Sequence, residues 1–263
     1  MLTFPNAKIN LGLNITAKRE DGYHDIESCF YPIPLKDALE IIPSEKLSFE
    51  TTGLKIPGNS NDNLVFKAYK LLKADFKLTP VDIILHKNIP MGAGMGGGSA
   101  NGAFMLTLLN DYFELNISTQ KLQQYALKLG SDCPFFIENK PKLISGRGEI
   151  SENTELDLSG YYLALVYPNI HISTAEAYSA VKPKKPAVSV KEIIETYPIE
   201  KWKDLLNNDF EKGIFEKYPQ LNEIKNKFYS EGAIYSSMTG SGSTIFGIFK
   251  ESSEKNYDTI LAL

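Results

Sequence analysis

The sequence has little of what disulfide frameworks, metal clusters and membrane spans require. Among 263 residues there are two cysteines, Cys29 and Cys133, and three histidines, with no CxxC pair and no metal-ligand spacing. Such sparse cysteine indicates a reducing, cytoplasmic location. No apolar run approaches the ~20 residues of a membrane helix. The first residues also lack the apolar core of a signal peptide, so we expect neither a membrane anchor nor export.

Positive charge is not in excess either. The 28 Lys and Arg residues against 32 Asp and Glu residues give a formal net charge of −4, which disfavours a nucleic-acid partner. Repeats and low-complexity segments are absent, and the hydrophobic fraction of 43% is ordinary for a globular protein. The length suits one large domain or two modest ones that share a cleft.

Glycine, by contrast, is concentrated in one stretch. Residues 90–101 read PMGAGMGGGSAN and hold five of the nineteen glycines. A strand-like run (81–87) precedes the stretch and a helix-like run (103–109) follows it. Glycines expose backbone N–H groups and tolerate positive φ, and the start of a helix attracts anions. The stretch therefore predicts a phosphate-binding loop.

Three familiar phosphate-binding patterns do not account for this loop. The Walker A motif fails because Gly98, and not lysine, precedes Ser99. The spacing GxGxxG is present, but the acidic residue at a suitable distance, Asp111, ends a helix-like run where a second strand is needed. The His-Arg-Asp and Asp-Phe-Gly motifs of protein kinases are absent.

The periodicity elsewhere mixes strands and helices in both halves of the chain, which predicts an α+β fold. We expect strands at 8–15, 25–31, 38–42, 46–51, 81–87, 161–167, 233–238 and 244–249, with Pro32 and Pro34 as breaks. We expect helices at 64–76, 103–109, 119–129, 199–214 and 219–229, two more that open at Ser173 and Ser189, and a short one at the C-terminus.

Two polar features of these elements allow two interpretations each. Lys8 and Asn10 share the polar face of the first strand, which is either solvated or lines a cleft. Asp132 follows the helix at 119–129 and either caps the next helix or takes part in chemistry. Cys133 beside it invites a thiol-nucleophile interpretation, which we reject because no motif places a histidine next to it.

Three segments resemble the motifs of the galactokinase, homoserine kinase, mevalonate kinase and phosphomevalonate kinase (GHMP) superfamily. Residues 90–101 resemble its ATP-binding signature, residues 7–11 its first motif and residues 238–243 its third. The resemblance implies an N-terminal ribosomal-protein-S5-like domain and a C-terminal ferredoxin-like α/β-plait domain, with the active site in the cleft between them. The chain turns polar near residues 150–160, and we place the domain boundary there: the N-terminal ATP-binding and catalytic domain at residues 1–152 and the C-terminal domain at residues 153–263.

Within that superfamily, residues 5–15, 21–24 and 130–136 resemble the family of kinases that phosphorylate 4-diphosphocytidyl-2-C-methyl-D-erythritol. The resemblance covers residues 5 to 250. It implies ATP-dependent phosphorylation of the 2-hydroxyl of a small molecule that carries cytidine diphosphate, in the non-mevalonate route to isopentenyl diphosphate. Thr239 stands where the family usually has serine, and Gly12 where a bulkier apolar residue is common.

The resemblance also implies roles for single residues. Asp132 matches the catalytic aspartate, as general base or orienting group, and Lys8 the catalytic lysine, which stabilises anionic charge. Ser99 is the candidate Mg²⁺ contact. The ATP-binding residues implied are Asn63, Leu64, Pro90, Met91, Gly92, Ala93, Gly94, Met95, Gly96, Gly97, Gly98, Ser99 and Ala100. The substrate-binding residues implied are Asn10, Tyr23, His24, Thr174, Tyr178, Gly240 and Ser241.

Other interpretations stay open at this point. Tyr23 and His24 are either cytosine contacts or packing groups, and Thr174 and Tyr178 either bind substrate or open a helix and fill the core. The chain could be another GHMP kinase, acting on homoserine, mevalonate or a sugar, or a silent ATP-binding regulator. The superfamily's N-terminal domain also shares its topology with a ribosomal protein, although the acidic balance argues against nucleic acid. We expect a monomer or a homodimer.

Overall fold

The computed structural model describes residues 1–252 and 257–263, and the chain divides into two compact units. Unit 1 comprises Met1–Ala7, Leu35–Met91 and Gly96–Lys140, and unit 2 comprises Lys8–Pro34, Gly92–Met95 and Pro141–Leu263. Both units combine helices with mainly antiparallel strands, which confirms the α+β class. The units interleave along the chain, and the division into residues 1–152 and 153–263 stays a prediction.

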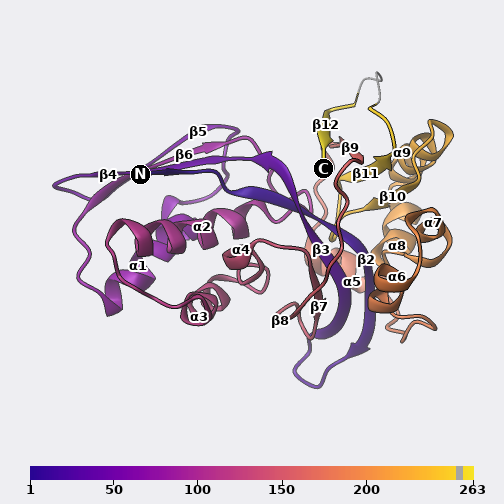
Figure 1. The fold of residues 1–263 in the computed structure, drawn as a ribbon, viewed down its shortest axis with the longest axis horizontal. Coiled ribbons are helices and arrows are strands. Elements are labelled where there is room, and N and C mark those ends of the chain that lie inside the picture. Colours follow the sequence, from indigo (N-terminus) through magenta and orange to yellow (C-terminus); the bar gives the residue numbers. More distant parts are fainter. Residues whose placement is uncertain (253–256) are drawn as a thin grey trace. The chain divides into compact units, whose positions relative to one another are not determined.

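Unit 1 is built on a four-stranded sheet in the order β1-β4-β6-β5, of which Figure 1 labels β4, β5 and β6. Its strands are β1 (Leu2–Thr3), β4 (Ala38–Pro43), β6 (Val81–Lys87) and β5 (Ser48–Gly53). Strand β5 runs parallel to β6, while the other two pairs are antiparallel. Every second residue of β6 is buried, so one face of the sheet packs against the core.

The helices of unit 1 cover one face of that sheet (Figure 1). They are α1 (Leu64–Asp75), α2 (Gly97–Tyr112), α3 (Thr119–Leu129) and α4 (Phe135–Glu138), with a short 3₁₀ turn, η1 (Ser60–Asp62). Asn63 caps α1 and Ser118 caps α3 through their side-chain oxygens. Helix α2 begins at Gly97, six residues earlier than expected, because the glycine run itself supplies its first turn.

The first sheet of unit 2 has the order β2-β3-β7-β8. Its strands are β2 (Asn6–Lys18), β3 (His24–Lys36), β7 (Lys142–Ser145) and β8 (Ile150–Asn153). The expectation that Pro32 and Pro34 break the strand is wrong, because β3 runs through both prolines. Its pairing with β7 ends at Phe30, so neither proline removes a hydrogen bond from that ladder.

The second sheet of unit 2 has the order β10-β11-β9-β12 and is antiparallel throughout. Its strands are β9 (Tyr162–Val166), β10 (Tyr235–Met238), β11 (Ile245–Phe249) and β12 (Thr259–Ala262). Among residues 257–263 the expected C-terminal helix is absent, because Thr259–Ala262 pair along the edge of β9.

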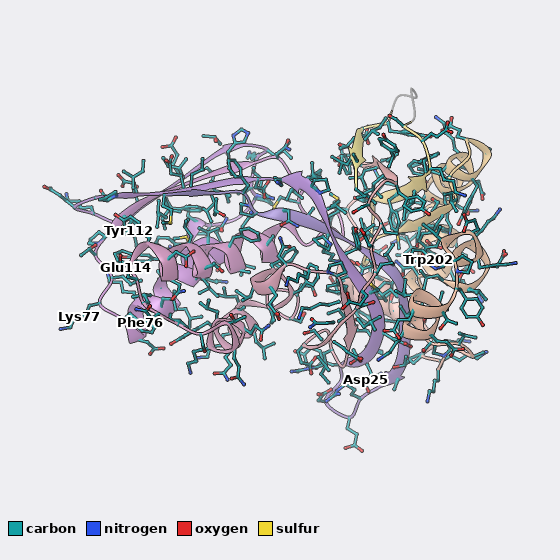
Figure 2. All side chains as sticks on the ribbon, viewed as in Figure 1. Asp25, Phe76, Lys77, Tyr112, Glu114 and Trp202 are labelled. Atoms are coloured by element: carbon teal, nitrogen blue, oxygen red, sulfur yellow. The ribbon has the colours of Figure 1, made fainter. Side chains whose placement is uncertain are left out.

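Six helical elements accompany this second sheet. They are α5 (Thr174–Ser179), α6 (Val190–Thr196), η2 (Ile199–Lys201), α7 (Trp202–Leu205), α8 (Phe210–Lys217) and α9 (Pro219–Ser230). Trp202, labelled in Figure 2, packs edge-on against Tyr235 of β10, and the two ring centroids are 5.8 Å apart. The single helix expected at 199–214 is interrupted at residues 206–209, where the backbone of Asn207 and Asp209 bonds to Leu13 of β2.

In the part of the chain that the structure describes, no helix has both the length and the apolar character that a membrane crossing needs.

Candidate active site

The glycine loop joins β6 to α2 and has a backbone that only glycine adopts easily. Gly92, Gly94 and Gly96 have φ values of +65°, +80° and +69°, and Gly96 is the N-cap of α2. A Cβ on Gly94 would lie 2.0 Å from the carbonyl oxygen of Thr239, so a side chain there is sterically impossible without rearrangement. The loop ends at a helix start, where free N–H groups suit phosphate oxygens.

The predicted loop residues have different environments. Ala93 and Met95 are buried, and the Met95 carbonyl accepts a hydrogen bond from Lys8 N at 3.0 Å. Gly97 and Ala100 are buried in the first turns of α2, where Ser99 is half-buried. Pro90, Met91 and Gly98 complete the loop and the helix start, and Met91 is 42% exposed.

Within unit 2, Lys8 takes part in a compact polar cluster with the loop. Its side chain is buried, and Nζ donates to Asn10 Oδ1 at 2.5 Å and to the Gly94 carbonyl at 3.1 Å. The ammonium group also lies 4.6 Å from the centroid of the Phe30 ring. The polar face of β2 is therefore buried here, and the solvated alternative is wrong for Lys8 and Asn10.

Thr239 completes this cluster, although sequence reasoning did not select it. Its hydroxyl lies 3.2 Å from Asn10 Oδ1 and 3.1 Å from the Gly94 carbonyl, the same two acceptors that Lys8 contacts. Asn10 N donates back to Thr239 Oγ1 at 3.1 Å. The three resembling segments of the sequence thus converge on one set of atoms. The hydroxyl retained at residue 239 was the signal that could have identified it.

Gly240 and Ser241, in the turn after β10, are both half-buried. Gly240 has a φ of +56°, and a Cβ there would lie 2.9 Å from the Gly94 carbonyl. Asn208 Nδ2 donates to the carbonyls of Met238 and Gly240 at 2.7 and 2.9 Å, which holds this turn against the segment before α8. Close backbone approach explains why small residues occupy the turn.

Asp132 lies in unit 1 between α3 and α4 and is half-buried. The N-cap of α4 is Pro134, which makes no side-chain hydrogen bond, and the choice between capping and chemistry for Asp132 stays a prediction. Burial raises the pKa of the neighbouring Cys133 thiol to about 12, and a hydrogen bond with Ser99 offsets only part of this. The thiol stays protonated at neutral pH, which excludes it as a ready nucleophile. The same contact holds the Asp132 turn beside the start of α2.

Five aromatic or cationic side chains gather near the start of β3 in unit 2. The rings of His24 and Tyr178 stack, with centroids 4.7 Å apart and planes 19° apart, and Tyr178 packs edge-on against Phe210. Tyr23 is 59% exposed, and the Arg147 guanidinium lies 5.0 Å from its ring centroid. Of the predicted substrate-binding residues, His24 and Tyr178 are therefore in contact, while Tyr23 lies beside Arg147.

The helix start that carries Thr174 belongs to the same unit. Ser173 caps α5 by accepting a hydrogen bond from Glu176 N at 3.1 Å, which confirms the helix expected to open at Ser173. Thr174 is the first residue of α5 and is exposed. Tyr178 is half-buried in the last turn.

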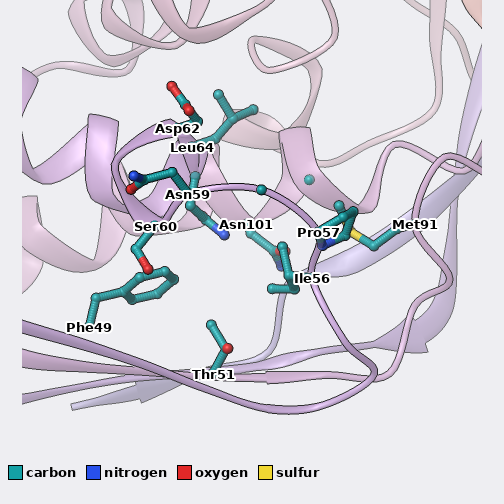
Figure 3. A pocket seen from close by; sticks show the side chains of 13 residues that line it. Phe49, Thr51, Ile56, Pro57, Asn59, Ser60, Asp62, Leu64, Met91 and Asn101 are labelled. Atoms are coloured by element: carbon teal, nitrogen blue, oxygen red, sulfur yellow. The ribbon is translucent and has the colours of Figure 1, made fainter.

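A cavity of about 260 Å³ opens in unit 1 beside the loop (Figure 3). Four of the predicted ATP-binding residues line it, namely Asn63, Leu64, Met91 and Gly98. The remaining lining residues, which sequence reasoning did not select, include Phe49, Thr51, Ile56, Asn59, Ser60 and Asn101. The alternation at 46–51 indicated a strand but could not show which space that strand faces.

Comparison with known proteins defines the class first. Residues 63–140 match the model for the GHMP kinases N terminal domain, and residues 194–256 match the model for the GHMP kinases C terminal. A homoserine kinase structure from Cytophaga hutchinsonii, only 16% identical, shares the fold with a TM-score of 0.70 over 94% of this chain and 85% of that one. The fold is that of the GHMP kinases.

The particular family follows from closer relatives. The chain is 54% identical over 253 residues to a 4-diphosphocytidyl-2-C-methyl-D-erythritol kinase from Bacteroides fragilis, covering 95% of this chain and 92% of the relative. A kinase of the same name from Cytophaga hutchinsonii is 49% identical, with 97% and 94% covered. The crystal structure of a 4-(cytidine 5'-diphospho)-2C-methyl-D-erythritol kinase is 31% identical, with a TM-score of 0.81 and 94% and 89% covered. The chain belongs to the 4-diphosphocytidyl-2-C-methyl-D-erythritol kinase family.

Proposed function

We propose that this protein transfers the γ-phosphoryl group of ATP to the 2-hydroxyl of 4-diphosphocytidyl-2-C-methyl-D-erythritol, giving the 2-phosphate and ADP. The observation that carries the proposal is 54% identity over 95% of the chain to a kinase of that name. The reaction is a step of the methylerythritol phosphate route to isopentenyl diphosphate. The hydroxyl oxygen bonds to the γ-phosphorus, the bond to the β–γ bridging oxygen breaks, and the hydroxyl proton leaves.

ATP is the co-substrate, as it is for GHMP kinases. Loop residues 90–96 and the first turn of α2 hold its phosphates through backbone N–H groups. The cavity at Asn63 and Leu64 takes the adenine, since it is partly apolar and lies beside the loop. These assignments rest on the helix start, on the positive φ values and on that cavity.

Asp132 orients the acceptor hydroxyl and takes its proton as charge develops on the oxygen. A carboxylate is a weak base for an alcohol, so orientation and late proton acceptance contribute more than prior deprotonation. Lys8 stabilises the anionic oxygens of the transferring group. Its buried position, fixed by Asn10 and the Gly94 carbonyl, supports this role because a pre-oriented cation needs no rearrangement during the reaction.

Mg²⁺ is proposed as the metal that accompanies ATP. Among the described residues no cluster of three or more His, Cys, Asp or Glu side chains could hold a metal ion. Mg²⁺ commonly binds through one or two protein oxygens together with the phosphates, and the Ser99 hydroxyl at the start of α2 fits that pattern. When bound, the metal would neutralise phosphate charge.

The cytidine end is proposed to bind at Tyr23, His24 and Tyr178, with Thr174 as a hydrogen-bonding neighbour. In the structure, His24 and Tyr178 already stack on each other, so a base cannot lie between these two rings unless they separate. The exposed face of Tyr23 is a stacking surface from which Arg147 can move away. Asn10, Gly240 and Ser241 would contact the remainder of the substrate.

Cellular and assembly properties remain proposals as well. A cytoplasmic location suits the substrate class, and both cysteines are free and buried. A monomer or homodimer without a nucleic-acid partner suits a small-molecule kinase.

The test is ATP consumption by purified protein with 4-diphosphocytidyl-2-C-methyl-D-erythritol, beside homoserine, mevalonate and galactose. Turnover with the cytidine substrate alone is the expected result. Turnover with another acceptor would support the kinase class and refute the proposed cytosine contacts. ATP binding without turnover on any acceptor would favour a silent regulatory protein.

A further inference from the structure

Unit 1 contains a fully buried carboxylate that the proposed chemistry does not use. Asp37 lies between β3 and β4, and its side chain is 0% exposed. Oδ2 accepts from Lys87 Nζ at 2.5 Å and from Asn101 Nδ2 at 2.8 Å. Oδ1 accepts from the backbone N–H groups of Asn88 and Ile89 at 2.7 and 2.8 Å. Four donors therefore satisfy this one carboxylate.

These donors come from both ends of the glycine loop. Asn88 and Ile89 are the two residues directly before Pro90, where the loop leaves β6. Asn101 belongs to the second turn of α2, just after the loop. One side chain thus fixes the distance between the strand that enters the loop and the helix that leaves it.

The start of α2 rests on the same group of residues. A Cβ on Gly97 would lie 2.8 Å from Ile89 Cγ2 and 3.0 Å from Lys87 Nζ, so the helix backbone approaches both closely. Asn101 also lines the 260 Å³ cavity beside the loop. A shift of Asn101 would change the cavity wall and the direction of the first N–H groups of α2.

Stability alone is a weak reason for this arrangement. A buried ion pair between Asp37 and Lys87 loses hydration on both charges, and an apolar pair of similar volume is often as stable or more so. Apolar side chains cannot, however, fix the direction of two backbone N–H groups and an amide. The Asp37 carboxylate can, because its two oxygens accept hydrogen bonds from all of these groups.

The geometry points to Asp37 as a positioning residue that holds the two ends of the phosphate-binding loop in the separation that ATP requires. The inference rests on the proposed ATP-dependent function, and it adds a residue outside the three GHMP motifs. Asp37 acts through Asn88, Ile89 and Asn101 and touches no reacting atom.

The test separates loop geometry from stability by measuring ATP affinity calorimetrically, without the acceptor. Asp37→Asn keeps one acceptor oxygen for the backbone but turns an NH₂ group toward Lys87 and Asn101. Loss of a charge-assisted bond at one loop end should raise the ATP Kd about tenfold or more. It should also lower the melting temperature, because Lys87 keeps an unpaired buried charge.

The double variant Asp37→Asn/Lys87→Met removes that unpaired charge. We expect it to recover most of the melting temperature and to keep the weakened ATP affinity, since the NH₂ group still faces Asn101. Val81→Ala, which truncates a fully buried residue at the far end of β6, is the control for lost stability without lost loop contacts. It should bind ATP within about twofold of wild type.

Asp37→Asn with wild-type affinity would overturn the inference, and so would a double variant that regains stability and affinity together. If Asp37→Asn does not fold, the ATP affinity of the double variant tests the inference alone. The inference is also overturned if Asp37→Asn loses no more ATP affinity than a control variant that has the same melting temperature. Wild-type protein that binds ATP but phosphorylates no acceptor would refute the proposed function and leave this test valid. Wild-type protein that does not bind ATP would refute both.

Discussion

At the residue scale, the clearest result is that Lys8 Nζ and Thr239 Oγ1 share two acceptors, Asn10 Oδ1 and the Gly94 carbonyl. Residue identities predicted that Lys8 and Asn10 lie on one strand face. They could not predict the partners, because hydrogen bonds between residues 10 and 239 depend on tertiary structure. The positions of Asn63 and Leu64 beside a cavity agree with the expectation for ATP, whose binding itself stays a proposal.

Asp132→Ala tests the proposed role of the carboxylate. Turnover should fall by about 10³-fold or more, because the acceptor hydroxyl loses its orienting and proton-accepting partner. ATP affinity, measured without acceptor, should stay within about threefold. Asp111→Ala, which removes an exposed carboxylate at the end of α2 in the same unit, is the matched control and should change neither quantity. Turnover of Asp132→Ala within about tenfold of wild type would refute the proposed mechanism.

At the element scale, strong local signals predicted α1, α3 and α9 well, because periodicity agrees with a side-chain cap at α1 and α3 and with a proline at the start of α9. Short strands were missed: β7 and β8 have four residues each, too few for a clear alternating pattern. The break before α8 was also missed, because backbone bonds from Asn207 and Asp209 to Leu13 outweigh the helical pattern.

Gly94→Ala tests the loop as an element. The positive φ disfavours alanine, and its Cβ would overlap the Thr239 carbonyl oxygen 2.0 Å away. We expect a loss of at least ~2 kcal/mol of unfolding free energy, or about 4–8 °C in melting temperature. ATP affinity should fall with it.

Gly98→Ala is the matched control in the same stretch. Gly98 lies inside α2 with no atom within 4 Å of an added Cβ, so alanine should hold or raise the melting temperature. Equal melting temperatures for Gly94→Ala and Gly98→Ala would refute the close contact between Gly94 and the Thr239 carbonyl.

At the scale of the whole molecule, two ligands should stabilise the fold independently. A non-hydrolysable ATP analogue at about 100 times its Kd should add about 2.7 kcal/mol, which is about 5–10 °C in melting temperature. The cytidine substrate should add a separate increment, since it is proposed to contact different residues. Thermal unfolding with each ligand and with both measures this. An increment for the pair no larger than that for one ligand would show that they compete for one site.

The interleaving of the two units has a consequence for synthesis on the ribosome. Unit 1 needs nothing beyond Lys140, whereas unit 2 combines Lys8–Pro34 with a segment that ends at Leu263. The earliest-made long strand must therefore wait for the last-made strands before its unit is complete, although domains generally fold in the order in which they emerge. A nascent chain stalled midway would carry every segment of unit 1, but its β2–β3 pair would still lack the part of unit 2 that follows Pro141. Truncation near the C-terminus would thus destabilise the unit to which residues 8–34, near the start of the chain, belong.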